Sequence, residues 1–143
     1  MATSGRRLTR AFVDTSVAVA LVVADHDAHR STTRALRGTR LGLSGHAWFE
    51  TYSVLTRLPQ PSRRSPADVV RILDANFPAT GFLDPSAAQA LAPELAANGI
   101  AGGGVYDALV GAAARAHRER LYTRDRRALS VYRALSVDAV VLE

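Results

Sequence analysis

The chain has 143 residues, of which 48% are hydrophobic, and these values are typical of one folded domain with a continuous core. All 18 basic residues are arginine, and the net charge is +5. The absence of lysine excludes a Walker A phosphate loop, and the absence of cysteine excludes disulfides and thiolate zinc sites. An all-arginine surface suits nucleic acid, although genome base composition explains the same choice equally well.

The N-terminus superficially resembles a secretory or twin-arginine signal. Arg6, Arg7 and Arg10 precede a mostly apolar stretch. Polar residues interrupt that stretch at positions 14–16, and only residues 17–24 are continuously apolar, which is too short to span a bilayer. We therefore expect a cytoplasmic protein without membrane association, in which residues 1–10 form a flexible tail.

Strand-like and helix-like patterns alternate through the rest of the chain. The patterns predict strands at 11–13, 40–44, 80–84, 121–123 and 138–143. They predict helices at 15–24, 25–38, 46–58, 65–77, 85–98 and 125–135, with a further helix after the glycine-rich segment 99–104. This alternation favours an α/β fold, a three-layer α/β/α sandwich with a mostly parallel central sheet, as a single domain over residues 11–143.

Two aspartates follow predicted strands, Asp14 after the first and Asp125 after the strand LYT. In parallel sheets the carboxyl ends of the strands form the edge where ligands bind. A helix follows each aspartate, so that helix N-capping explains either residue equally simply.

Two further acids lie on helix faces where apolar or small residues are expected. Glu50 shares a face with apolar side chains and is expected to point inward, and the structural alternative is an acid at the end of its helix that reaches solvent. Asp107 shares a face with Gly104, Gly111 and Ala114, which permit close helix packing. A first-turn aspartate also gains from the helix dipole, which is the structural alternative for Asp107.

Four carboxylates at one end of a fold repel one another and need protonation or a cation to coexist. Oxygen-only ligands favour a hard ion such as Mg²⁺ or Mn²⁺. We interpret Asp14 and Asp107 as direct ligands. Glu50 and Asp125 bind a second ion or orient water in this interpretation.

The motifs VDTS (13–16), FE (49–50), GGGVYDALV (102–110) and LYTRD (121–125) resemble, in order and spacing, those of PIN-domain nucleases. The resemblance is specifically to the VapC-type toxins of bacterial toxin–antitoxin pairs, and it runs from about residue 11 to the C-terminus.

This resemblance implies a metal-binding and catalytic quartet of Asp14, Glu50, Asp107 and Asp125. It places Ser16 and Thr123 beside the quartet as supporting hydroxyls. It also implies hydrolysis of RNA, often tRNA or rRNA, with Mg²⁺ or Mn²⁺. The expected partners are a second copy of the chain, forming a homodimer, and a cognate antitoxin of the VapB type.

Several other side chains are candidates for contacts with substrate or partner. Arg124, Arg126 and Arg127 flank the last acid, and we expect them to contact RNA phosphates. A second arginine group at 115–120 is more simply explained by the helix C-terminus and by solubility. The aromatic-rich segment 48–55 is most simply core or dimer contact rather than a base-stacking surface.

Two other functions fit parts of the pattern. One is a catalytically silent PIN-like module that binds RNA or a partner. The other is a phosphohydrolase of the haloacid dehalogenase type, which usually requires an aspartate two residues after the first; Ser16 stands there. Intact acids at all four positions favour the nuclease.

Overall fold

The computed structural model describes residues 9–143, so residues 1–8 of the expected tail lie outside the described range. Thr9 and Arg10 belong to the first strand, which therefore starts at residue 9 rather than 11. The reason is pairing with the neighbouring strand, because Thr9 is in register with Thr39 and Arg10 with Arg40.

Helices and strands alternate over most of the described range. In chain order the elements are β1 (Thr9–Val13), α1 (Thr15–Val22), α2 (His29–Ala35), β2 (Thr39–Leu43), α3 (Ala47–Thr56), α4 (Pro66–Asn76), α5 (Pro85–Ala97), α6 (Gly104–Ala116), β3 (Leu121–Thr123), the 3-10 turn η1 (Arg126–Ala128), α7 (Leu129–Ala134) and β4 (Ala139–Val141).

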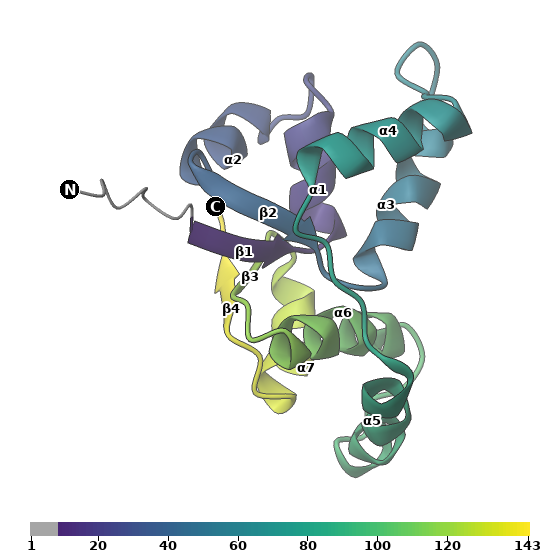
Figure 1. Cartoon of the computed structure of the whole chain (residues 1–143), viewed down its shortest axis with the longest axis vertical. Helices are drawn as coiled ribbons and strands as arrows, with labels where there is room; N and C mark the ends of the chain where they lie inside the picture. The colour runs from purple at the N-terminus through teal and green to yellow at the C-terminus, as the bar shows by residue number, and fades with distance from the viewer. Residues whose placement is uncertain (1–8) are drawn as a thin grey trace, which may run out of the picture.

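The strands form one parallel sheet in the order β2-β1-β3-β4. Helices α1 to α4 lie on one side of it and α5 to α7 on the other (Figure 1). The α/β sandwich with a parallel sheet predicted from the sequence is therefore confirmed. Because all four strands run in the same direction, the residues that follow β1 and β3 lie at the same edge.

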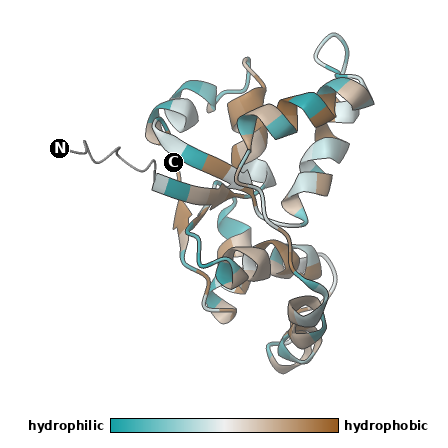
Figure 2. Cartoon of the chain, viewed as in Figure 1, coloured by the Kyte–Doolittle hydropathy of each residue, from teal (hydrophilic) through white to brown (hydrophobic). Residues whose placement is uncertain are grey.

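The core lies between the sheet and the two helical layers. Phe12 and Val13 of β1 are almost fully buried, and so are Val17 of α1 and Leu43 of β2. Helix α1 is largely coloured as hydrophobic in Figure 2, which agrees with its central position. Each fully buried side chain of this size contributes about 1.5–3 kcal/mol through burial.

The predicted strand at 80–84 is wrong. Within this segment only Gly81 forms a β-bridge, which is an isolated bridge to Ser44. The segment follows the edge of β2 as an irregular loop, with the Gly81 N–H donating to the Leu43 carbonyl at 3.3 Å. Asp84 then caps α5 by accepting a hydrogen bond from the Ala87 N–H, so the chain turns into a helix before a strand can extend.

The predicted helix at 25–38 is also shorter than expected, because α2 begins at His29. Residues 25–28 form turns instead. The ring Nδ1 of His26 accepts a hydrogen bond from the Ala28 N–H at 3.0 Å, and such a local bond competes with the helical pattern. The last strand is also shorter than predicted, because β4 spans Ala139–Val141 and the prediction was 138–143.

Among residues 9–143, no helix combines the length and the apolar character needed to cross a membrane.

Candidate active site

The four predicted acids meet at the carboxyl edge of the sheet. Asp14 follows β1 and Asp125 follows β3, while Glu50 and Asp107 lie in the first turns of α3 and α6. All four line one small cavity of about 60 Å³. Four segments that are far apart in the sequence therefore bring their carboxylates together.

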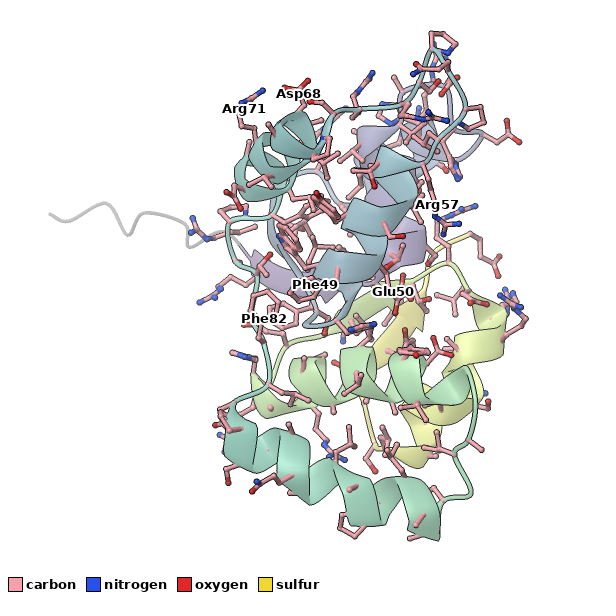
Figure 3. All side chains as sticks on the ribbon, turned by 90° about the vertical axis from the view of Figure 1, so that its right-hand side faces the viewer. Phe49, Glu50, Arg57, Asp68, Arg71 and Phe82 are labelled. Carbon is pink, nitrogen blue, oxygen red and sulfur yellow. The ribbon has the colours of Figure 1, made fainter. Side chains whose placement is uncertain are left out.

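Three of the acids, Glu50, Asp107 and Asp125, also line a larger cleft between α3 and α6, with a volume of about 610 Å³. In Figure 3, α3 lies above α6 and carries Glu50 at its lower end. The cleft is lined by His46, Glu50, Gly103, Gly104, Tyr106, Asp107, Asp125 and Arg127.

Asp14 is the most deeply buried of the acids, with 5% of its surface exposed. Its Oδ1 accepts hydrogen bonds from the Ser16 hydroxyl at 2.5 Å and from the Val17 N–H at 3.3 Å, and its Oδ2 accepts one from the Tyr132 hydroxyl at 3.0 Å. Burial raises the pKa of Asp14 above its ordinary value, while these hydrogen bonds act in the opposite direction. The hydrogen bond from the Val17 N–H also makes Asp14 the N-cap of α1. Asp14 therefore caps a helix and lies in the candidate site at the same time.

Two hydroxyl groups connect the ends of β1 and β3. The Ser16 hydroxyl, which donates to Asp14, accepts a hydrogen bond from the Arg124 N–H at 2.8 Å. The Thr123 hydroxyl lies 3.5 Å from that of Ser16 and accepts a hydrogen bond from the Asp125 N–H at 3.0 Å. Ser16 and Thr123 therefore lie beside the acids, as the resemblance implied, and hold the two strand ends in register.

Tyr132 is a site residue that the sequence analysis missed. It lies on the apolar face of α7, together with Leu129 and Leu135, and 1% of its surface is exposed. Burial raises the pKa of Tyr132 strongly, so its hydroxyl stays protonated and donates to Asp14. The spacing of Leu129, Tyr132 and Leu135 is typical of a buried helix face, and it is the signal from which a core tyrosine could have been predicted. Nothing local indicated the acid that its hydroxyl meets.

Glu50 lines both the cleft and the small cavity and is half-buried, so it faces the other acids while part of its surface stays exposed. Its Oε2 accepts a hydrogen bond from the Thr15 hydroxyl at 3.4 Å, and its Oε1 lies 3.6 Å from the His46 Nε2. Burial is the main cause that raises the pKa of Glu50. His46 opposes that rise, and the charges of Asp107 and Asp14 add to it.

Asp107 is positioned by the turn that leads into α6. Gly102 adopts a φ of +58°, in the left-handed region that favours glycine, and the chain turns sharply there before the helix begins. Burial raises the pKa of Asp107, and the charges of Asp125 and then Asp14 raise it further. The acids are thus electrostatically coupled.

The three arginines beside the last acid have different environments. The Arg127 side chain is 93% exposed, lines the cleft and donates to both carboxylate oxygens of Asp125 at 3.3 and 3.4 Å. Arg126 pairs with Glu143 instead. Arg124 contributes its backbone N–H to the network around Ser16. Of the three, Arg127 alone is among the residues that line the cleft.

Two members of the second arginine group form ion pairs between elements of the fold. Arg115 donates to both carboxylate oxygens of Glu94 at 3.2 and 2.6 Å and to the Leu135 carbonyl at 2.8 Å. It therefore ties α6 to α5 and to the end of α7. Arg120 pairs with Asp138 at 3.2 Å, between the segments that precede β3 and β4.

Within residues 9–143, no three side chains of His, Cys, Asp or Glu are grouped as a ready-made metal centre. The carboxylates nevertheless surround one cavity, and like charges raise the pKa of two of them. Such an arrangement of oxygen donors attracts protons or a hard cation.

Residues 11–134 match the model of the PIN domain family. The chain is 46% identical over 129 residues to Ribonuclease VapC27 of Mycobacterium tuberculosis (strain ATCC 25618 / H37Rv), covering 90% of this chain and 94% of that protein. It is 44% identical over 128 residues to Ribonuclease VapC40 of Mycobacterium tuberculosis (strain CDC 1551 / Oshkosh), covering 87% and 93%.

The fold is also similar to that of a solved structure, VapBC2 from Rickettsia felis bound to a DNA fragment from its promoter. The TM-score is 0.67 at 14% identity, and the match covers 94% of this chain and 100% of the other. The chain belongs to the PIN domain family, among its VapC-type members.

Proposed function

We propose that this protein is a metal-dependent endoribonuclease that acts as the toxin of a toxin–antitoxin pair. The observation that carries the proposal is the convergence of Asp14, Glu50, Asp107 and Asp125 on one cavity at the carboxyl edge of the sheet. The relatives named above as ribonucleases indicate RNA as the substrate.

The donor set fits Mg²⁺ or Mn²⁺. Every donor of the quartet is a carboxylate oxygen, which these hard ions prefer. Burial raises the pKa of Glu50 and Asp107, neighbouring negative charges raise both further, and a divalent cation would offset that repulsion. In our assignment Asp14 and Asp107 bind the ion directly. Glu50 and Asp125 hold a second ion or orient water.

In the proposed hydrolysis, the oxygen of a water molecule attacks the phosphorus, one P–O bond breaks and the departing oxygen takes up a proton. A bound divalent ion supplies the Lewis acidity that activates water and neutralises charge on the phosphate. Ser16 and Tyr132 hold the carboxylate of Asp14 in place through hydrogen bonds to each of its oxygens. Arg127, at the cleft, is suited to contact a neighbouring phosphate.

The proposal extends to substrate class, partners and compartment. We infer a tRNA or rRNA substrate, a homodimer, a cytoplasmic location and an antitoxin of the VapB type. The similarity of the fold to a chain of a VapBC structure supports the inferred antitoxin.

Induced expression of the chain in bacteria should arrest growth, and co-expression of its antitoxin should relieve the arrest. Growth unaffected by an active nuclease would contradict the toxin role.

The decisive experiment is cleavage of labelled total RNA by purified, antitoxin-free protein with Mg²⁺ or Mn²⁺, with EDTA, and with Asp107→Asn. We expect discrete cuts that disappear with EDTA and in the variant, because an amide keeps the shape but is a poor cation ligand. Asp74→Asn is the matched control, since Asp74 is an exposed helical aspartate on α4, and its cleavage should equal the wild type.

Full activity of Asp107→Asn would remove this residue from the site. RNA binding without cleavage, in a folded protein supplied with metal, would favour the silent binding module. A covalent aspartyl-phosphate on Asp14 would instead indicate a phosphohydrolase.

A further inference from the structure

A row of aromatic rings leads from the cleft across the surface. Tyr106 of α6 stacks on His46, with ring centroids 5.2 Å apart and an interplanar angle of 20°. His46 lies 6.3 Å from Phe49 of α3, and Phe49 lies 6.0 Å from Phe82 in the loop before α5. Figure 3 shows Phe49 and Phe82 side by side, with Glu50 next to Phe49 on α3.

The outer rings of this row are unusually exposed. Tyr106, Phe49 and Phe82 expose 53%, 55% and 48% of their surfaces, so Phe49 is not part of the core of the chain, and of the two roles predicted for its segment only dimer contact is left for this residue. The cause is local: Thr51 and Leu55 occupy the buried face of α3, and Phe49 projects away from it. Exposed rings that adjoin one another mark a surface suited to a ligand with flat apolar faces.

The row begins inside the candidate active site. His46 and Tyr106 line the same cleft as Glu50, Asp107 and Arg127. Tyr106 directly precedes Asp107, so its ring is fixed next to a proposed metal ligand. The cleft volume of about 610 Å³ is within the range of small-ligand pockets.

We propose that Tyr106, supported by His46, stacks an unpaired nucleobase next to the phosphate that is cut. This inference rests on the proposed ribonuclease function. A phosphate at the carboxylates places the adjoining base within reach of the ring, because both line one cleft. In duplex RNA both faces of each base are covered by its neighbours, so a paired base cannot stack on a protein ring.

Charge supports a nucleic acid as the occupant. Arg127 presents a 93% exposed guanidinium at the cleft, and the chain has a net charge of +5. Aromatic faces combined with arginines along a groove are the usual means of binding single strands, and stacking tolerates any base. Phe49 and Phe82 continue the row and would receive the next bases of the strand.

The test measures binding separately from cleavage. A short single-stranded RNA with 2-aminopurine at successive positions is titrated with the full-length protein in EDTA, and anisotropy and 2-aminopurine emission are followed. We expect emission to be quenched at one position. We expect Tyr106→Ala to lose the quenching and to weaken binding roughly fivefold or more, as loss of one stacked base does. Tyr106→Phe should retain both, because the ring is kept.

Two controls and a parallel assay complete the test. Val70→Ala truncates an apolar side chain on α4 that is 39% exposed and is not among the residues lining the cleft, and it should behave as wild type. The same RNA annealed to its complement should bind at least roughly tenfold more weakly. Light scattering gives the oligomeric state of each variant, and cleavage with Mn²⁺ is measured in parallel.

If the wild type cleaves RNA but Tyr106→Ala binds and quenches as before, the stacking inference fails and the nuclease stands. If Tyr106→Ala instead changes the oligomeric state, the ring belongs to an interface between copies, and the inference also fails. If the wild type neither binds nor cleaves RNA, the proposed function fails and the inference with it.

Discussion

The side-chain hydroxyl of Ser16 has three polar neighbours. Its hydroxyl donates to Asp14, accepts from the Arg124 N–H and lies beside the Thr123 hydroxyl. A serine in this place positions a carboxylate and also joins the ends of two strands. Side chains of this kind act on chemistry through the residues they hold.

We predict that Ser16→Ala lowers RNA cleavage by about 10–100-fold, the usual effect of losing a group that orients a metal ligand. Asp14 would lose the shortest of its hydrogen bonds and gain rotational freedom. Cleavage rates at saturating Mn²⁺ test this, with Ser53→Ala, at an exposed serine on α3, as the control. An unchanged rate would mean that the Val17 and Tyr132 contacts suffice.

The raised pKa values of Asp14, Glu50 and Asp107 predict an unusual dependence on pH. Metal binding needs these groups ionised, so at subsaturating Mn²⁺ cleavage should fall on acidification at a higher pH than ordinary carboxyl groups would give. A profile that declines only at the ordinary pKa of aspartate, 3.8, would contradict this.

In the absence of metal, the free energy of unfolding should depend on pH in the opposite direction to cleavage. The folded pKa of Asp14 exceeds its unfolded value, so between these two values the folded state binds more protons. This contribution to the free energy of unfolding therefore falls as the pH rises through that window. Asp14→Asn, which cannot ionise, should weaken that dependence in thermal melts recorded in EDTA.

At the scale of elements, α6 and α7 pack closely enough to position Tyr132. Gly111 faces the Tyr132 ring, and a Cβ at this position would lie 2.9 Å from its Cδ1 and 3.1 Å from the Val137 Cγ2. The absence of a side chain at Gly111 therefore lets the hydroxyl of Tyr132 reach Asp14.

We predict that Gly111→Ala destabilises the protein and lowers its activity. Alanine gains about 1 kcal/mol in helix propensity, but overpacking a filled core costs about 1–3 kcal/mol. The net loss should be roughly 1 kcal/mol, measured by denaturant unfolding. Gly103→Ala is the control for the unfolding measurement alone, because apart from its chain neighbours no atom lies within 4 Å of its Cβ position; Gly103 lines the cleft, so its activity is not compared. A stabilised, fully active Gly111→Ala protein would show that Tyr132 can move without consequence.

The alternation of elements and the acids at their ends could be predicted from the sequence, because each depends on local pattern. Ser65 and Asp84, each followed directly by a proline, cap α4 and α5, and such a pattern is a local signal for the start of a helix. The segment 80–84 has a strand-like composition, and its irregular path depends on the distant edge of β2. The role of Tyr132 likewise depends on a partner 118 residues away, which no local pattern records.

For the whole molecule, an ion that binds the folded state alone must stabilise it. At a concentration 100 times its dissociation constant, Mn²⁺ should raise the free energy of unfolding by about 2.7 kcal/mol. Thermal melts with and without Mn²⁺ measure this shift, which Asp107→Asn should largely abolish and Asp74→Asn should leave intact. An equal shift in both variants would locate the bound ion elsewhere.

The contacts of Asp14 also bear on when the protein becomes functional during synthesis. This residue is made among the first, but Tyr132, near the C-terminus, completes its hydrogen bonds. A ribosome must therefore release almost the entire chain before the carboxylate is held in place. A nascent or prematurely ended chain has its first acid but not the helix that secures it.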